Sequence, residues 1–323
     1  MKLGDVRTIQ FEVWQNCNNG CDFCYLNKAR ITHKPKEQIE DIEKVRKVIN
    51  SPELNDYNAI GLIGGEFFQG QLSDPEVKSH WLELIQDMSK YLKDGKLVEC
   101  WITASLMSKD LTDIFETFDL FPKDKKILLS TSYDEKGRFH TEEQRQIWFE
   151  NIKIMHEKYP NVVVHTQIIA TQDFIDRVLK DESIIHDILK YSSVDFKLPG
   201  ILHIDYGKLK NRNEKTYHDL LLKKSKGFPD GFFIKHRDDF LKFMRKIAKI
   251  FGNEKILWFC QNEVRSKKLY LIADNSVIED RWDPDDLDEN ASCGHILDSY
   301  CYLDSDKCAR CDAMKLYEQL VEF

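Results

Sequence analysis

Apolar strand-like runs alternate with amphipathic helical segments through the first two thirds of the chain. The strand-like runs lie at residues 8–14, 59–63, 97–104, 126–132, 162–170 and 194–198. Between them, apolar residues recur at helical spacing, most clearly in 36–50, 75–92 and 142–159. Six strands with intervening helices predict an α/β fold with a parallel sheet, either open or partly rolled into a barrel. In both arrangements ligands gather at the carboxyl ends of the strands.

Two polar signals mark expected helix starts. Thr141 and Gln144 have the spacing of a capping box, in which each side chain bonds the backbone N–H of the other residue. Ser108 precedes a short helical segment, and its hydroxyl makes it a candidate N-cap. These signals predict where two of the helices begin.

The pattern changes after residue 205. Residues 206–227 are rich in lysine and asparagine and are interpreted as a connector, and 237–250 are predicted to be a helix. Residues 269–278 resemble a hairpin with Asp274-Asn275 at its turn, and a cysteine-rich tail follows. We therefore predict a core domain over 1–205 and a connector with a small second domain over 206–323.

The charge and the lack of long apolar runs limit the function classes. The chain has a formal net charge of -8, and an acidic protein is a poor candidate for general nucleic-acid binding. The lysine-rich strip at 208–249 is interpreted as a solvated surface. No targeting segment and no apolar run of about 18 residues is visible, so we expect a cytoplasmic protein without a membrane contact.

The cysteines are clustered. Of nine in the chain, three lie between residues 17 and 24 and four between 293 and 311. An odd number without a signal peptide argues against a disulfide framework. Clustered thiols in a reducing compartment favour metal binding.

The first cluster is Cys17, Cys21 and Cys24. Their spacing would align three thiols on a helix, but Asn18-Asn19-Gly20 are poor helix formers and favour a loop. A loop after a strand can bring three thiolates around one iron–sulfur cluster and leave one iron open for a ligand. A zinc site is the alternative interpretation of the same three residues.

These three cysteines match the Cys-x₃-Cys-x₂-Cys motif of radical S-adenosylmethionine (SAM) enzymes, and Phe23 fits the aromatic position before the third cysteine. The resemblance implies a partial (β/α)₆ barrel, a [4Fe-4S] cluster on Cys17, Cys21 and Cys24, and SAM at the open iron. It also implies reductive cleavage of SAM to a 5′-deoxyadenosyl radical that abstracts hydrogen from a substrate. The electron would come from a reducing partner such as flavodoxin or ferredoxin.

Further residues resemble the SAM-binding positions of that family. Gly64-Gly65-Glu66 follows the second strand and is similar to its Gly-Gly-Glu motif, although Phe67-Phe68 stands where proline often follows. Glycines allow close backbone approach, and a carboxylate can accept a bond from an ammonium group. Polar residues at later strand ends complete the predicted SAM site, namely Thr103, Ser130, Ser132, Asp134 and Gln167.

The tail resembles the auxiliary-cluster domains, of SPASM or twitch type, that follow some radical SAM barrels. The resemblance implies a second [4Fe-4S] cluster, with zinc as the rival metal and His295 as a possible zinc ligand. Cys308-x₂-Cys311 is a common thiolate-ligand spacing. The first-choice ligands are Cys260, Cys301, Cys308 and Cys311, with Cys293 as the alternative.

The substrate class follows from analogy alone. Relatives with auxiliary clusters often modify peptides or proteins, so a peptide or protein substrate is expected, with a nucleoside-type or other small molecule as the alternative. Two other classes remain open: a non-catalytic zinc-binding adaptor, and a SAM-binding protein that regulates a partner. His140, His165, His203 and Cys100 are assigned no role.

Overall fold

The structure, a computed structural model, describes about two thirds of the chain. The described residues are 8–22, 24, 32–97, 99–197, 230–231, 239, 242–243, 246–247, 249–250, 266–271 and 276–279. Phe23, the connector at 206–227 and all five cysteines from Cys260 onward lie outside them.

Six parallel strands form the centre of the structure in the order β6-β5-β4-β3-β2-β1. Each strand pairs with the next one along the chain, as βαβ units with short crossovers require. The predicted α/β fold with a parallel sheet is thus confirmed. The strands are β1 (Thr8–Glu12), β2 (Ala59–Ile63), β3 (Glu99–Thr103), β4 (Ile127–Tyr133), β5 (Val162–Ile169) and β6 (Ser193–Lys197).

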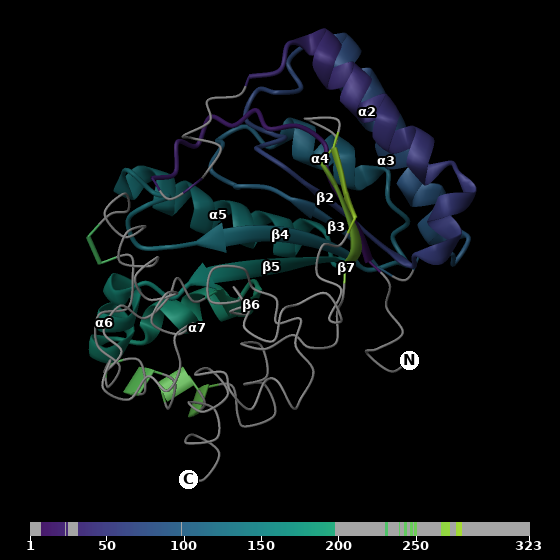
Figure 1. Cartoon of the computed structure of the whole chain (residues 1–323). Coiled ribbons are helices and arrows are strands. Elements are labelled where there is room, and N and C mark those ends of the chain that lie inside the picture. The colour runs from purple at the N-terminus through teal and green to yellow at the C-terminus, as the bar shows by residue number, and fades with distance from the viewer. Residues whose placement is uncertain are drawn as a thin grey trace, which may run out of the picture.

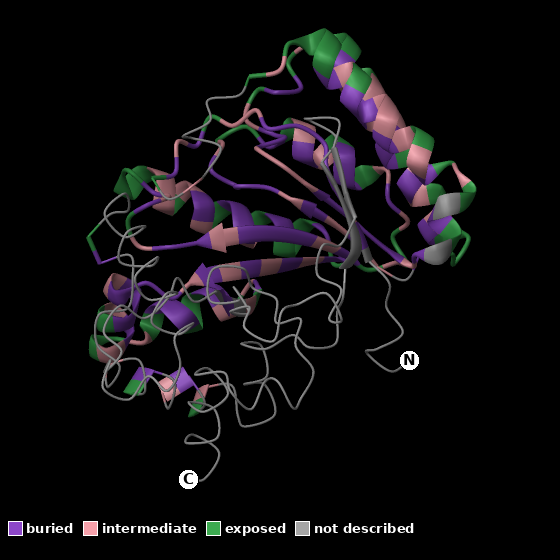
Figure 2. Ribbon diagram, viewed as in Figure 1, coloured by how far each residue is buried: buried purple, intermediate pink, exposed green. Residues whose placement is uncertain are grey.

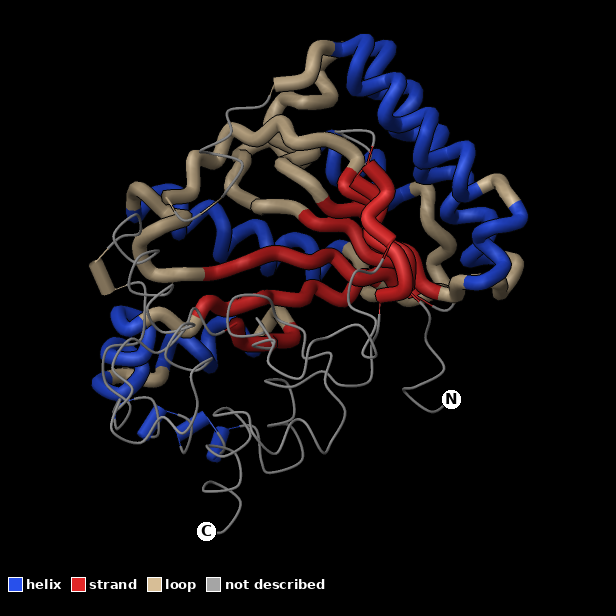
Figure 3. The backbone as a smooth tube through the Cα atoms, in the orientation of Figure 1, coloured by secondary structure: helices blue, strands red, loops and turns tan. Residues whose placement is uncertain are grey.

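The helices lie on one side of this curved sheet (Figures 1 and 3). Their inner faces carry the buried apolar residues and their outer faces are exposed (Figure 2). The elements are α2 (Pro35–Ile49), the 3₁₀ helix η2 (Pro52–Asp56), α3 (Pro75–Lys93), α4 (Thr112–Asp119), α5 (Glu142–Lys158), α6 (Gln172–Lys180) and α7 (Ser183–Leu189).

The two faces of the sheet differ in chemistry. On the helix side Leu129 is fully buried, and Trp148 Nε1 of α5 donates to Thr131 Oγ1 at 3.0 Å. Residues of the opposite parity, such as Trp101 and Gln167, are half-exposed. Polar side chains at strand ends on that second face are therefore available to a ligand.

Local signals located one helix start correctly and the other incorrectly. Thr141 caps α5, because Gln144 N donates to its Oγ1 at 3.2 Å and Thr141 N donates to Gln144 Oε1 at 3.3 Å. Ser108 is not the cap of α4, which begins at Thr112 after Leu111. Its hydroxyl instead accepts from Asp110 N at 3.1 Å, in a turn before the helix.

The predicted hairpin at 269–278 is present and has an unexpected partner. β7 (Ser266–Leu271) pairs antiparallel with β8 (Ser276–Glu279). β7 also pairs in parallel with β1, with Leu271 opposite Glu12, so the sheet has eight strands. The last third of the chain thus contributes two strands at the β1 edge (Figure 1).

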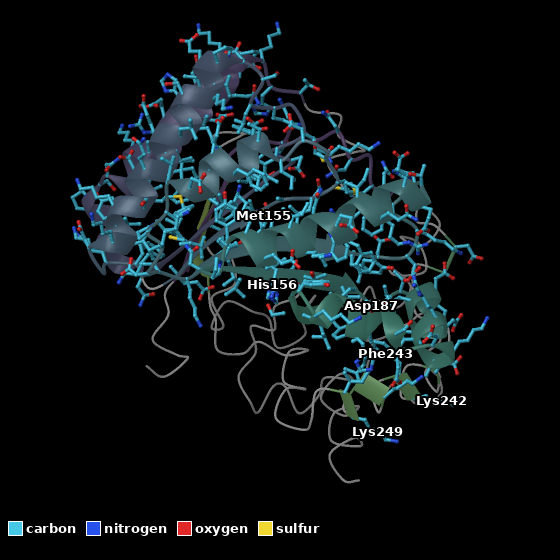
Figure 4. All side chains as sticks on the ribbon, turned by 180° about the vertical axis from the view of Figure 1, so that it is seen from behind. Met155, His156, Asp187, Lys242, Phe243 and Lys249 are labelled. Atoms are coloured by element: carbon cyan, nitrogen blue, oxygen red, sulfur yellow. The ribbon has the colours of Figure 1, made fainter. Side chains whose placement is uncertain are left out.

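The described residues of the predicted helix 237–250 are helical. Phe243 is fully buried and contacts Phe174 of α6 and Phe196 of β6, with ring centroids 6.0 and 5.6 Å away. Lys246 Nζ donates to Val178 O at 2.9 Å. Figure 4 shows Phe243 on this segment beside the α6–α7 end of the structure. Within the described part of the chain, no helix is both long and apolar enough to span a bilayer.

Candidate functional site

The segments that follow β1 and β2 run side by side at the carboxyl edge of the sheet. Val13 N donates to Ile63 O at 3.0 Å, Gly65 N donates to Trp14 O at 2.9 Å, and Glu66 N donates to Asn16 O at 2.7 Å. These bonds continue the β1–β2 pairing beyond the strands. The residues before Cys17 are therefore fixed directly against the Gly-Gly-Glu motif.

The two glycines are required by this contact. A Cβ at Gly64 would lie 2.3 Å from Trp14 O, and one at Gly65 would lie 2.0 Å from Asn16 O. Gly64 also has a φ of +151°, which L side chains rarely adopt. Close backbone approach was expected of these glycines, and the structure shows it toward the segment that follows β1.

Glu66 connects three segments of the site. Its Oε1 accepts from Phe67 N at 3.0 Å and from Phe68 N at 2.9 Å. Its Oε2 accepts from Ser105 N, after β3, at 2.7 Å and from Asn19 Nδ2 of the cysteine loop at 3.4 Å. Four donors fill the usual acceptor capacity of one carboxylate. An ammonium group of a ligand would have to displace one of them, so the structure gives this carboxylate an organising role.

Phe67-Phe68, which replaces the expected proline, serves the same arrangement. The Phe67 ring lies 5.1 Å from the Trp14 ring and 4.8 Å from the Trp81 ring, measured between centroids, and all three are fully buried. Proline at this position would remove both the buried ring and an N–H that donates to Glu66.

The cysteine loop is non-helical, as Asn18, Asn19 and Gly20 predicted. Cys21 is buried, Cys17 and Cys24 are half-buried, and Cys24 N donates to Cys21 O at 3.0 Å. None of the three forms a disulfide with a described residue. The three predicted ligands thus lie in one non-helical segment after β1, and their binding of a common cluster stays a prediction.

Asn16 ties the entrance of the cysteine loop to the chain beyond it. Its Nδ2 donates to His33 O at 2.9 Å, and His33 N donates back to Asn16 Oδ1. The His33 ring in turn lies 2.8 Å from Asp41 of α2, measured from Nδ1 to Oδ2. Asn16 and His33 are therefore bonded to each other, and His33 is attached to α2.

The turn between β4 and α5 packs against the cysteine loop. Asp134 Oδ1 accepts from the backbone N–H groups of Lys136, Gly137 and Arg138 at 3.0, 2.6 and 3.2 Å. Gly137 O then accepts from Asp22 N, next to Cys21, at 2.9 Å. Asp134, predicted as a SAM contact, thus first shapes this turn.

The electrostatics of the site oppose thiolate formation in the absence of a metal. Burial raises the pKa of Cys21 to about 11, and burial also raises the pKa of Cys17. The guanidinium of Arg138 counteracts the shift at both thiols. Burial likewise raises the pKa of Asp134, which is 1% exposed. A bound cation or metal cluster would therefore be needed to stabilise three thiolates here.

Four of the predicted polar residues share the face of the sheet that the helices leave open. Thr103 pairs with Ser130, and Ser132 pairs with Gln167. Thr103, Ser132 and Gln167 are half-exposed, while Ser130 is 9% exposed. Thr103 Oγ1 donates to Leu62 O at 3.3 Å. These side chains form a polar row on that face, toward the carboxyl ends of β3, β4 and β5.

Two residues at this site were not predicted from the sequence. Asn16 directly precedes Cys17, but its bonds to His33 cross the loop and leave no local pattern. Arg138 lies far along the chain from Cys24. The available signal was its position four residues after Asp134, a carboxylate at a strand end that can accept from the following N–H groups.

The donor set fits an inorganic cluster. Three buried polar atoms around the thiols have no hydrogen-bond partner among the described residues, namely Asn19 Oδ1, Asp134 Oδ2 and Arg138 Nε. Glu43, His80 and Glu83 are the one group of described residues whose potential ligand atoms all lie within 4.8 Å of one another. The three sulfur atoms therefore do not all lie within 4.8 Å of one another, whereas sulfurs on one zinc ion lie about 3.8 Å apart for Zn–S bonds of about 2.3 Å.

No protein-family model matches this chain, and no curated protein sequence matches it. Among solved structures, the crystal structure of Streptococcus suis SuiB bound to S-adenosylmethionine is similar over 77% of this chain and 50% of that chain. The sequence identity is 12% and the TM-score is 0.35. The matched region is thus half the length of SuiB.

Proposed function

We propose that this protein is a radical SAM enzyme with a partial (β/α)₆ barrel, which binds a [4Fe-4S] cluster through Cys17, Cys21 and Cys24. The observation that supports the proposal is that these three cysteines lie in one non-helical loop, which is bonded to both Glu66 and the Asp134 turn. Three protein thiolates leave one iron of such a cluster open to a ligand. When bound, the cluster would supply one electron that splits SAM into methionine and a 5′-deoxyadenosyl radical.

The residues of the chain would position the cofactor. Glu66 fixes the cysteine loop relative to the ends of β2 and β3 through its four hydrogen bonds. Asp134 keeps one carboxylate oxygen for a polar group of the ligand. The row formed by Thr103, Ser130, Ser132 and Gln167 offers hydroxyl and amide groups to the rest of SAM on the open face.

The substrate and partners are extensions of this proposal. A peptide or protein substrate is the first choice by analogy, a nucleoside-type or other small molecule is the second, and flavodoxin or ferredoxin is the expected electron donor. Cys260, Cys301, Cys308 and Cys311, with Cys293 as alternative, are proposed to bind a second cluster or zinc. A cytoplasmic location stays a prediction.

The test of the proposal is anaerobic SAM cleavage. The protein is reconstituted with iron and sulfide, reduced with dithionite and incubated with SAM, and 5′-deoxyadenosine is measured. Cys17→Ala, Cys21→Ala and Cys24→Ala should each abolish the product. Cys100→Ala is the matched control, because Cys100 is a buried thiol of β3 on the helix side and should not affect the product. An intact cluster that never cleaves SAM would falsify the catalytic claim.

Metal analysis distinguishes the tail alternatives. If the tail binds a second cluster, the triple variant lacking Cys17, Cys21 and Cys24 should keep about half of the iron of the wild type. If the tail binds zinc, the triple variant should be colourless and contain zinc. A Cys308→Ala variant that retained all metal would exclude both forms of the tail site.

The adaptor hypothesis makes a different prediction. A non-catalytic zinc protein would be colourless when isolated anaerobically, and its zinc would depend on Cys17, Cys21 and Cys24.

A further inference from the structure

Arg138 has no role in the function proposed above, although it is placed beside the thiols. Its neighbour Gly137 accepts from Asp22 N at 2.9 Å, and Asp22 directly follows Cys21. The backbone N–H of Arg138 donates to Asp134 Oδ1 at 3.2 Å, so the residue is held by the turn that packs on the cysteine loop. Its position is thus fixed by two hydrogen bonds that do not involve its side chain.

The guanidinium has an unused donor. Its Nε is buried and has no hydrogen-bond partner among the described residues. A buried donor without an acceptor costs free energy, and such groups in native structures commonly mark an unseen ligand or ion.

Hydrogen bonds occupy both carboxylate oxygens of Glu66 and Oδ1 of Asp134, while Asp134 Oδ2 has no partner among the described residues. Glu66 accepts four hydrogen bonds, and Asp134 accepts three through its Oδ1. Their negative charges oppose additional negative charge at the thiols. Arg138 is therefore a described cation that can compensate the charge of a cluster bound there.

We propose that Arg138 is the charge partner of the cluster, and that its positive charge makes the cluster easier to reduce. Reduction adds one electron from an external donor and breaks no bond, so the reduced cluster carries one more negative charge. A fixed cation nearby stabilises this state more than the oxidised state, because net charge and hydrogen bonding around a cluster set its reduction potential. This inference rests on the cluster of the proposed function.

The test is a redox titration of the reconstituted protein without SAM, followed by electron paramagnetic resonance of the reduced cluster. Arg138→Gln should lower the equilibrium constant for reduction about tenfold, which is about 59 mV for a one-electron couple. Arg138→Lys keeps the charge and should restore most of the potential. Arg145→Gln is the matched control, since Arg145 pairs with Glu135 and Glu142 and should leave the potential unchanged.

Iron content decides whether each variant can be compared. If Arg138→Gln loads full iron and keeps the wild-type potential, the inference is overturned, and a loss confined to SAM affinity would identify Arg138 as a ligand contact instead. If Arg138→Gln loses iron and Arg138→Lys retains it, the charge is needed to hold the cluster and the inference is supported. If Arg138→Gln and Arg138→Lys lose iron equally, cluster binding depends on the shape of the Arg138 side chain and not on its charge. That result also overturns the inference.

A wild-type protein without a [4Fe-4S] signal would contradict the proposed function itself. A normal wild-type signal with an unchanged variant would contradict the role of Arg138 alone. The two failures are thus distinguishable in one set of titrations.

Discussion

Single side chains at the carboxyl edge of the sheet connect segments that are far apart in the sequence. Glu66 is the clearest case, because it bonds the β2 turn, the residue after β3 and the cysteine loop. It is 2% exposed, so a donor or acceptor that loses its partner there is shielded from bulk water. Replacing such a residue should therefore affect several segments at once.

Glu66→Gln should destabilise the protein, although the substitution only replaces one carboxylate oxygen by an NH₂ group. In the wild type these N–H donors are hydrogen-bonded to a carboxylate oxygen. In the variant some of them would face the amide NH₂, which cannot accept, and each lost bond leaves a buried group unpaired. We expect a loss of about 1–3 kcal/mol in the free energy of unfolding, measured by denaturant titration. Glu157→Gln, on the exposed side of α5, is the control and should change little. Equal stability of both variants would contradict the organising role of Glu66.

Gly65→Ala should separate the cysteine loop from the β2 turn. The added Cβ would lie 2.0 Å from Asn16 O, so one of the two backbones must move. We expect about 1–3 kcal/mol of destabilisation, as for other overpacked sites, and a lower iron content after reconstitution. Gly70→Ala has open space around the new Cβ and tests only backbone strain at its positive φ. The prediction is wrong if Gly70→Ala has the larger effect on iron content.

Local sequence signals predicted the helix starts with unequal success. The Thr141 capping box was predictable because both partners lie within four residues. Ser108 was misleading, since the start of α4 depends on burial of Leu111, which is 7% exposed and part of the core. The six parallel strands followed from alternation alone. The β1–β7 pairing and the Arg138 contact could not be predicted, because their partners lie more than 100 residues apart.

Thr141→Ala should weaken the start of α5. The side chain accepts from Gln144 N, and its loss leaves that N–H without its cap. N-cap substitutions of this kind typically cost about 1 kcal/mol, which a thermal or urea unfolding curve can measure. Thr141→Ser retains the hydroxyl and should behave like the wild type. An alanine variant with unchanged stability would show that the cap does not contribute.

The contact between α2 and α3 should lose stability in acid. Burial would raise the pKa of Glu43, but hydrogen bonds from His80 and Arg46 outweigh it and keep the pKa below its ordinary value. A carboxyl with a lowered folded-state pKa stabilises the protein above its unfolded pKa, and this contribution is lost as the pH falls through the folded value. The difference in unfolding free energy between wild type and Glu43→Gln should therefore be full at pH 7 and shrink below about pH 4.5. A difference independent of pH would contradict the ion-pair origin.

At the scale of the whole molecule, one sheet joins both ends of the described chain. β7 lies between β1 and β8, so it is an interior strand although it comes from the last third of the sequence. It also covers the edge of β1, the strand from which the cysteine loop departs. An uncovered edge strand is a common site of aggregation.

Tyr270→Pro should therefore lower both stability and solubility. Tyr270 pairs with Phe11 of β1 and with Val277 of β8, and proline removes a backbone donor from an interior strand. We expect a lower melting temperature and more aggregate by size-exclusion chromatography. Tyr270→Thr loses the same ring but keeps the N–H, so it should be less affected. If the two variants behave alike, the backbone pairing is not important for the sheet.

The β1–β7 pairing also has a consequence during synthesis. The first six strands can pair one after another as they leave the ribosome, because each lies next to its predecessor. β1 cannot complete its second edge until Leu271 has been made, 271 − 12 = 259 residues after Glu12. At about 5–20 residues per second, that edge stays open for about 13–52 s. A nascent chain stalled before residue 266 should accordingly bind chaperones through β1, and release from them should follow the emergence of the hairpin.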